Sequence, residues 1–145
     1  MAESRLVDVL TSVQRVLTRD LADRFSEEGA SVEQWRVLRT LAEADEGTSM
    51  SELAESVQIP APSLTRLVDS LVDRAQVYRR PSAHDGRRVD VHLSVTGREL
   101  LTRLEAIAEA HERSVANRVG ARELKDALAS LERLTPVVRF EPELR

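Results

Sequence analysis

The chain of 145 residues contains no cysteine, only four aromatic residues other than histidine, and no long hydrophobic run. Without cysteine it cannot form a disulfide, a thiolate zinc site, an iron–sulfur cluster or a thiol-based redox switch. Its apolar runs fall far short of the roughly 20 residues that a membrane-spanning helix needs, so we expect no membrane partner. The first residues lack a basic stretch followed by an apolar core, which predicts a cytoplasmic protein.

Glycine and proline are also scarce, with five of each, while 41% apolar and 32% charged residues are ordinary for a folded chain. A chain of this length is expected to form a single domain with a modest core. It has no glycine-rich phosphate loop, no nucleophile motif, and no clustered histidines or acids with the spacing of metal ligands. We therefore expect neither an enzyme nor a bound cofactor or metal.

Charge is unevenly distributed along the chain, whose formal net charge is −4. The segment from residue 60 to residue 98 contains seven arginines and four aspartates, whereas the rest contains fourteen basic and twenty-one acidic residues. An overall acidic charge argues against a nucleic-acid binder, but a local basic segment is what such binding requires.

The first two helices are predicted from spacing and capping signals. Apolar residues recur every three or four positions from about Ser4 to Phe25, which indicates an amphipathic helix. Ser31 and Gln34 form a capping box that begins a second helix.

A pair of short helices follows. Ser49 and Glu52 form another capping box, which predicts a helix through Val57. Pro60 interrupts it, and Pro62 suits the first turn of the next helix because its missing N–H would have no partner there. The buried face of that helix is expected to consist of Leu64, Leu67, Val68, Leu71 and Val72. Two helices of about eight and about thirteen residues joined by a tight turn indicate a helix-turn-helix.

The apolar period then changes from that of a helix to that of a strand. Val89, Val91 and Leu93 alternate with polar residues, which predicts a strand with one buried face. Residues 77–80 can pair with it, and residues 81–86 between them contain the proline, aspartate and glycine that turns favour. A β-hairpin is therefore expected directly after the helix-turn-helix.

The C-terminal part of the chain is again helical. A capping box formed by Thr96 and Glu99 predicts a helix to about Val119, where Gly120 ends it. At about 1.5 Å per residue this helix would span roughly 35 Å, which is more than a domain of this size needs for itself. A last amphipathic helix follows and is expected to end at Pro136.

Four short motifs succeed one another through the predicted helix-turn-helix and hairpin. They are Ser49-x-x-Glu52-Leu53-Ala54, Pro62-Ser63-Leu64-Thr65-Arg66-Leu67-Val68-Asp69-x-Leu71, Asp85-Gly86-Arg87-Arg88 and Leu93-Ser94-x-x-Gly97. Each motif is weak alone, but in this order and at this spacing they resemble the MarR family of bacterial transcription regulators. The resemblance covers about residues 31 to 104.

This resemblance implies a mainly α-helical fold with a small β-hairpin wing, in which a winged helix-turn-helix is flanked by N- and C-terminal dimerisation helices. Within one domain of residues 1–145, the DNA-binding lobe would comprise residues 31–95 and the dimerisation segments residues 1–28 and 96–145. The sequence independently supports dimerisation segments at the two ends, because the terminal helices are amphipathic and a small winged helix has no core that could bury their apolar faces. Alternatively, they cover their own domain as ordinary helices.

The resemblance also implies that a homodimer binds double-stranded DNA at a palindromic operator. The second helix of the pair would enter the major groove, where Arg66 can contact guanine and Ser63 and Thr65 can contact phosphates or base edges. Ala61 matches another exposed position of this helix. Alternatively, Ser63 is a plain helix cap and Arg66 a solvated surface charge.

The hairpin would supply a second contact. Arg87 matches the family's wing arginine, which enters the minor groove, and Asp85 matches the acid that would orient its guanidinium. Arg79, Arg80 and Arg88 are expected to contact phosphates. Arg80 and Arg88 are alternatively solvated charges of an ordinary hairpin.

One departure from the family pattern concerns the end of the second helix. Ala75-Gln76 stands where the family usually has Gly-Leu. Alanine in a left-handed cap costs about 1 kcal/mol relative to glycine, which leaves open how this helix ends. Ser94 replaces the usual threonine, and we expect it to cap a helix equally well.

The resemblance finally implies a repressor that a small ligand, often an aromatic acid, releases from DNA. Candidate ligand-binding residues are Arg15, Arg19, Trp35 and His111. Each has a plainer interpretation: Trp35 as a core residue, His111 as an interface histidine, and the two arginines as surface charges. The competing function is protein–protein docking by the winged helix without sequence-specific DNA binding, for which an acidic surface would be suitable.

Overall fold

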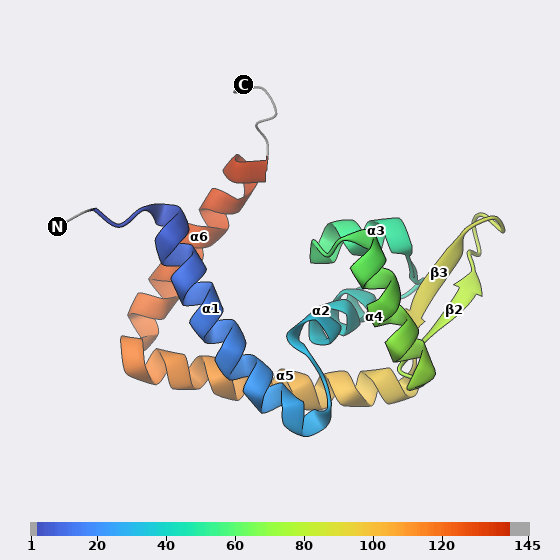
Figure 1. Cartoon of the computed structure of the whole chain (residues 1–145), viewed down its shortest axis with the longest axis horizontal. Coiled ribbons are helices and arrows are strands. Elements are labelled where there is room, and N and C mark those ends of the chain that lie inside the picture. The colour runs from blue at the N-terminus through green and yellow to red at the C-terminus, as the bar shows by residue number, and fades with distance from the viewer. Residues whose placement is uncertain (1–2, 140–145) are drawn as a thin grey trace. The chain divides into compact units, whose positions relative to one another are not determined.

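The structure, a computed structural model, describes residues 3–139, which are mostly helical (Figure 1). The chain packs as two units, one ending at Ile107 and the other beginning at Ala108. No helix in the described residues is both long and apolar enough to cross a membrane. The elements are α1 (Leu6–Phe25), η1 (Ser26–Glu28), α2 (Val32–Glu43), β1 (Thr48–Ser49), α3 (Met50–Val57), α4 (Ala61–Asp73), β2 (Val77–Pro81), β3 (Val89–Leu93), α5 (Val95–Val119) and α6 (Ala121–Arg139).

Both capping boxes predicted for the first unit are confirmed. At the start of α2, Ser31 Oγ accepts from the Gln34 N–H at 3.1 Å, and Gln34 Oε1 accepts from the Ser31 N–H at 3.0 Å. Ser49 and Glu52 repeat this exchange at the start of α3. Each box satisfies two backbone donors that a helix otherwise leaves open, so the two helices begin at defined residues.

The core of the first unit is formed by α2, α3, α4, β3 and the first half of α5. The side chains that are almost fully buried are Phe25, Val37, Leu38, Leu53, Leu64, Val68, Leu71, Val77, Val91 and Leu104. Leu67 and Val72, predicted to be buried, lie at the margin of α4 and are partly exposed. Helix α1 contributes only Leu21 and Phe25 to the buried set.

The sheet has three strands in the order β1-β3-β2, and both pairings are antiparallel. The predicted hairpin is confirmed as β2 and β3, whose register pairs Val77 with Leu93 and Pro81 with Val89. Strand β1 was not predicted, because two residues are too few to show an alternating pattern. It pairs with the free edge of β3 and so joins the start of α3 to the hairpin.

The predicted buried face of β3 is partly wrong. Val89 is 50% exposed and Asp90 only 7% exposed, the reverse of what alternation predicts. Val89 lies opposite Pro81 at the outer end of the hairpin, where no helix covers it. Asp90 is flanked on both sides, since it pairs with Ser49 in β1 and with Arg80 in β2.

Helix α4 ends in a left-handed turn although it has no glycine there. Ala75 adopts φ 58°, and its N–H donates to the carbonyl of Val72 at 2.9 Å. The N–H of Gln76 donates to the carbonyl of Leu71 at 2.9 Å, which completes a Schellman motif. The helix therefore ends as a glycine-capped helix does, with alanine in the unfavourable conformation.

The capping box predicted at Thr96 and Glu99 is wrong, because α5 begins two residues earlier. Ser94 Oγ accepts from the Gly97 N–H at 3.0 Å and donates to the carbonyl of Ala75 at 2.6 Å. A Cβ on Gly97 would lie 1.9 Å from the carbonyl oxygen of Gln76, so only glycine fits. Ser94 caps the helix, as expected from its place in the motif, because β3 ends at Leu93.

The second unit consists of the later turns of α5, from Ala108 onward, and of α6; the two helices meet at Gly120. Gly120 ends α5 with φ 112°, as predicted. The expected end at Pro136 is wrong, because α6 continues through it to Arg139. A proline removes one hydrogen bond and crowds the preceding turn, which weakens a helix without always ending it.

Candidate nucleic-acid interface

The helix-turn-helix exposes one face of α4. Helix α3 ends at Gln58, whose φ is 55°, and Pro60 then caps the start of α4. Leu64, Val68 and Leu71 face the core. The predicted DNA-contacting residues of this helix are all exposed: Ala61, Ser63, Thr65 and Arg66. The periodicity that buries one face therefore leaves the opposite one open to a ligand.

The hydroxyl groups of α4 differ in their local roles. Ser63 is not the cap of the helix, since Pro60 holds that position and makes no side-chain hydrogen bond. Thr65 Oγ1 donates to the carbonyl of Ala61 at 3.0 Å, so its oxygen keeps acceptor capacity.

The tip of the hairpin is ordered by its own hydrogen bonds. The Ser82 N–H donates to the carbonyl of Arg88 at 2.8 Å, and the Arg88 N–H donates to the carbonyl of Asp85 at 2.9 Å. Ser82 Oγ accepts from the N–H groups of His84 and Asp85, at 3.2 and 3.4 Å. These bonds present the exposed Arg87 at the end of the wing.

Asp85 acts on the backbone of Arg87. Its Oδ1 accepts from the Arg87 N–H at 3.0 Å. The expectation was a contact with the guanidinium, but the aspartate closes a local turn instead, as aspartates often do two residues before a donor. Asp85 therefore positions Arg87 through the main chain of Arg87 and not through its guanidinium.

Two of the wing arginines form ion pairs with helices of the helix-turn-helix. Arg79 on β2 is paired with Asp69 on α4. Arg88 Nη2 lies 3.0 Å from Glu52 Oε1 on α3 and 3.9 Å from Asp90 Oδ1. The hydrogen bond between Arg88 and Glu52 lowers the pKa of the glutamate and raises the pKa of the arginine.

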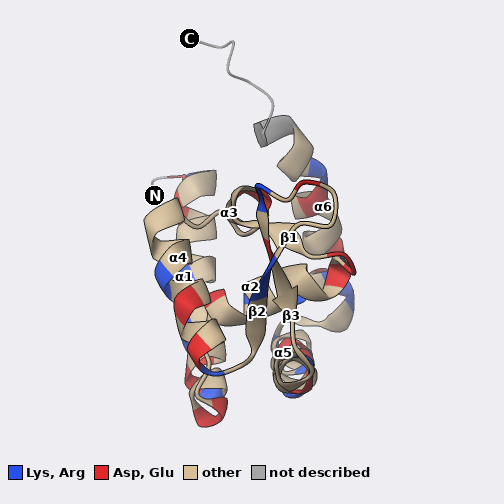
Figure 2. Cartoon of the chain, turned by 90° about the vertical axis from the view of Figure 1, so that its right-hand side faces the viewer, with Lys and Arg blue, Asp and Glu red and all other residues tan. Residues whose placement is uncertain are grey.

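Arg80 lies against an aromatic side chain of the hairpin. Its guanidinium carbon is 5.2 Å from the centre of the Tyr78 ring, within the range of a cation–π contact. Tyr78 stacks on His92, with ring centres 5.1 Å apart and planes 9° apart. With basic and acidic residues side by side, the wing and α4 form a mixed surface and not a uniformly basic patch (Figure 2).

Trp35, a candidate ligand-binding residue, is held within the first unit. Its Nε1–H donates to Glu105 Oε1 at 3.0 Å, and the Arg39 Nε lies 3.0 Å from the same oxygen. The rings of Trp35 and Phe25 have centres 5.4 Å apart. These contacts agree with the plainer interpretation of Trp35 as a packing residue.

The other three candidates lie on helices of different units. Arg15 and Arg19 are exposed on α1 in the first unit. His111 lies on α5 in the second unit and is 7% exposed. Their role in ligand binding stays a prediction.

A model of the MarR family matches residues 28–88, which include α2, the helix-turn-helix and most of the wing. Two uncharacterised helix-turn-helix transcriptional regulators are similar over more of the chain. One, from Mycobacterium leprae, is 36% identical over 101 residues, covering 69% of each chain. Another, from Mycobacterium bovis, is 33% identical over 132 residues, covering 89% of each.

The chain belongs to the MarR family. It is therefore a winged helix-turn-helix transcriptional regulator, in a family of regulators and not of enzymes. The fold is shared with the reduced form of MarR from E. coli, at a TM-score of 0.82 and 21% identity, covering 92% of this chain and 98% of that one.

Two further solved MarR-type structures contain ligands. A MarR family protein of Mycobacterium tuberculosis in complex with salicylic acid is 27% identical, with a TM-score of 0.76, covering 91% of this chain and 97% of that one. The repressor CouR, bound to a 23-mer DNA duplex, is 25% identical, with a TM-score of 0.79, covering 93% and 99%.

Proposed function

We propose that this MarR-family regulator binds a palindromic DNA operator as a homodimer and acts as a repressor. The observation that carries the proposal is the exposed face of α4, with Ser63, Thr65 and Arg66, next to a wing whose turn presents Arg87. A helix of this size fits the major groove, and an arginine suits a narrow minor groove. The similarity to CouR, which is solved with a DNA duplex, supports the same class of ligand.

In this proposal Ala61, Ser63, Thr65 and Arg66 contact the major groove and Arg87 the minor groove. Asp85 positions Arg87, and Arg79, Arg80 and Arg88 contact phosphates. Phosphate contacts add affinity but carry no sequence information, so specificity falls on Arg66 and its neighbours.

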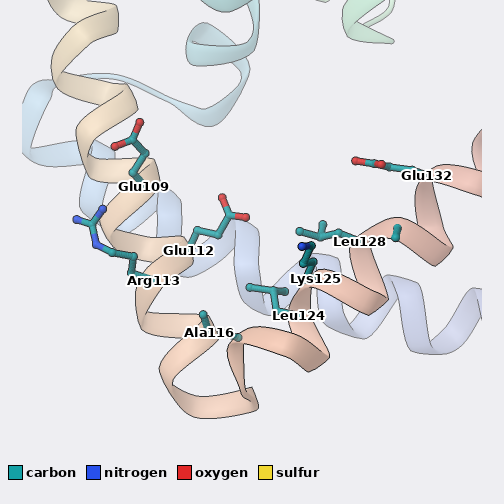
Figure 3. A pocket seen from close by; sticks show the side chains of 10 residues that line it. Glu109, Glu112, Arg113, Ala116, Leu124, Lys125, Leu128 and Glu132 are labelled. Carbon is teal, nitrogen blue, oxygen red and sulfur yellow. The ribbon is translucent and has the colours of Figure 1, made fainter.

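The apolar surfaces of α1 and α6 support the homodimer. On α1 the large residues that stay exposed are Leu6, Val7, Val9, Leu10, Val13, Val16 and Leu17, and Val7 is exposed by 71%. In the second unit a cleft of about 640 Å³ lies between α5 and α6, with Leu124 and Leu128 directed into it (Figure 3). Covering such surfaces contributes about 25 cal/mol per Å², which a second copy of the chain can supply.

We also propose residues 31–95 as the DNA-binding lobe and residues 1–28 and 96–145 as the dimerisation segments. Residues 1–2 and 140–145 of those segments lie outside the described part of the chain. The first half of α5 packs in the same unit as the lobe, since the division falls after Ile107. Helix α5 would thus serve both parts.

A small ligand is proposed to release the protein from DNA, and the similarity to a salicylic acid complex makes an aromatic acid the first probe. A ligand that binds better to a DNA-incompetent arrangement weakens DNA binding by its difference in affinity. The candidates are Arg15, Arg19, Trp35 and His111. Salicylate should reduce DNA binding in a titration, and alanine at the true contacts should remove that response.

The direct test measures binding to the DNA preceding the protein's own gene by fluorescence anisotropy. Arg66→Ala and Arg87→Ala should each weaken operator binding roughly 10- to 100-fold, as expected for lost base or groove contacts of about 1–3 kcal/mol. Arg24→Ala is the matched control, because this arginine lies on α1 and pairs only with Asp20 among the ion pairs of the described residues. Circular dichroism checks that the variants stay folded.

Salt distinguishes this function from the competing one, a winged helix that docks another protein. DNA binding through arginines should weaken steeply as salt rises, because bound arginines displace counterions. Unchanged operator affinity in both arginine variants would refute the DNA-contact roles.

A further inference from the structure

Arg88 and Arg79, two arginines of the proposed DNA surface, are already engaged by the chain's own carboxylates. Glu52 on α3 holds Arg88 at 3.0 Å, and Asp69 on α4 is paired with Arg79 on β2. Arg79 lies in the middle of β2 and Arg88 directly before β3, so each pair joins the wing to one helix of the helix-turn-helix. The partners lie 36 residues apart in the Glu52–Arg88 pair and 10 residues apart in the Asp69–Arg79 pair, so helix or strand spacing predicts neither.

We propose that Glu52 occupies Arg88 in the free protein in place of a DNA phosphate, and that this internal ion pair restrains DNA affinity. The proposal rests on the DNA-binding function proposed above and adds a residue that sets its strength. A phosphate oxygen must then compete with a carboxylate oxygen for the same guanidinium, because both anions accept the same N–H donors.

The carboxylate of Glu52 is fixed independently of Arg88. Its Oε2 accepts from the Ser49 N–H at 3.3 Å in the capping box of α3, while its Oε1 accepts from Arg88. The acid is therefore held at the helix start by the backbone, with one oxygen left to engage the arginine. A carboxylate held in this way does not need the arginine to keep it in place.

Both partners are accessible to an incoming phosphate. The side chains of Arg88 and Glu52 are 48% and 58% exposed. Exposed ion pairs contribute little to stability because water screens them, so DNA can displace this one without disturbing the core. Asp90, whose side chain is 10% exposed, lies 3.9 Å from the Arg88 guanidinium, beyond hydrogen-bond distance.

The restraint acts on every DNA sequence alike. A carboxylate beside Arg88 cancels much of the attraction of that arginine for the backbone and repels a nearby phosphate. Phosphate contacts carry no sequence information, so relieving the restraint should strengthen binding to random DNA as much as to an operator. The pair would thus limit non-specific binding.

The test compares Glu52→Gln with wild type on a duplex of random sequence, over a series of salt concentrations. Glutamine keeps the capping box, as Gln34 shows at the same position of α2, but it has no charge for Arg88. We expect the variant to bind up to about five-fold tighter at low salt. The slope of log affinity against log salt should steepen by at most about 0.9, because Arg88 then neutralises its phosphate without a carboxylate beside it.

Glu55→Gln is the matched control, since it removes the same charge from the same helix. Glu55 is exposed and makes no ion pair within the described part of the chain. Its gain in DNA affinity should be clearly smaller than that of Glu52→Gln, and the slope of log affinity against log salt should not change. In an Arg88→Ala background, Glu52→Gln should give no more gain than Glu55→Gln.

Asp69→Asn provides a second, independent variant, which frees Arg79 and should likewise tighten random-sequence binding. The proposal is overturned if Glu52→Gln binds no tighter than Glu55→Gln, or if its gain persists without Arg88. Failure of the DNA-binding function looks different: the wild type would then show no salt-dependent binding, and Arg66→Ala and Arg87→Ala would match it.

Discussion

The helix-turn-helix lobe and the terminal helices use apolar residues in opposite ways. In the lobe, Leu38, Leu53 and Leu64 are completely buried. On α1, the apolar stripe leaves Leu6, Leu10, Val13 and Leu17 exposed and buries only Leu21 and Phe25, and on α6 Leu128 is 41% exposed. The same spacing of three and four residues thus produces a closed core in one region and open faces in the others. Amphipathic spacing predicts a helix but not what covers it.

The largest expected effect comes from a cavity in the closed core of the helix-turn-helix lobe. Leu38→Ala removes a fully buried side chain from α2 and should lower the free energy of unfolding by about 2–5 kcal/mol. Urea denaturation followed by circular dichroism measures this loss. Leu38→Met, which conserves volume, should cost less than about 1.5 kcal/mol. Similar losses for both variants would mean that the site is not tightly packed.

An intermediate effect is expected in the open region of α6. Leu128→Asp places a charge in the cleft between α5 and α6, and should weaken the proposed dimer by about 2–3 kcal/mol, or on the order of 100-fold. Analytical ultracentrifugation should show monomers at concentrations where the wild type is dimeric. The melting temperature of the variant should also lose its dependence on protein concentration.

Ala127→Asp is the control for this prediction, because it adds the same charge at the neighbouring residue, which does not line the cleft. Equal dissociation by both variants would show that charge on α6, and not the apolar face, determines association. A wild-type chain that is monomeric at all concentrations would remove the contrast between the two regions.

The smallest effect concerns a local compromise inside the lobe. Ala75→Gly should stabilise the chain by about 1 kcal/mol, because Ala75 adopts φ 58° at the end of α4. Urea denaturation of the variant and the wild type measures the difference in the free energy of unfolding. Ala83→Gly is the control, since it is not among the positive-φ residues of the described chain and should give no gain.

Local signals account for most of what the sequence predicted correctly. The capping boxes of α2 and α3 and the turn before α4 depend on residues within three or four positions of one another. The hairpin was predictable for the same reason, because its alternation and its turn residues lie within one short segment.

The missed features depend on partners distant in the sequence. Strand β1 exists because β3 offers it a free edge, and Asp90 is buried for the same reason. The ion pair of Glu52 and Arg88 joins residues that only the fold brings together, and no spacing rule predicts it. The wrong cap at Thr96 was a local error, since Ser94 and Thr96 compete as caps and the end of β3 decides between them.

The contact between Gly97 and the carbonyl of Gln76 has a mechanical consequence. Ser94 makes two hydrogen bonds to the residues after α4, of 2.6 Å to Ala75 and 3.1 Å to Gln76, and the two segments approach so closely at Gly97 that a Cβ would not fit between them. The end of α4 and the first turn of α5 therefore form one stiff corner. We therefore expect a tilt imposed on the start of α5 to move the end of α4 with it.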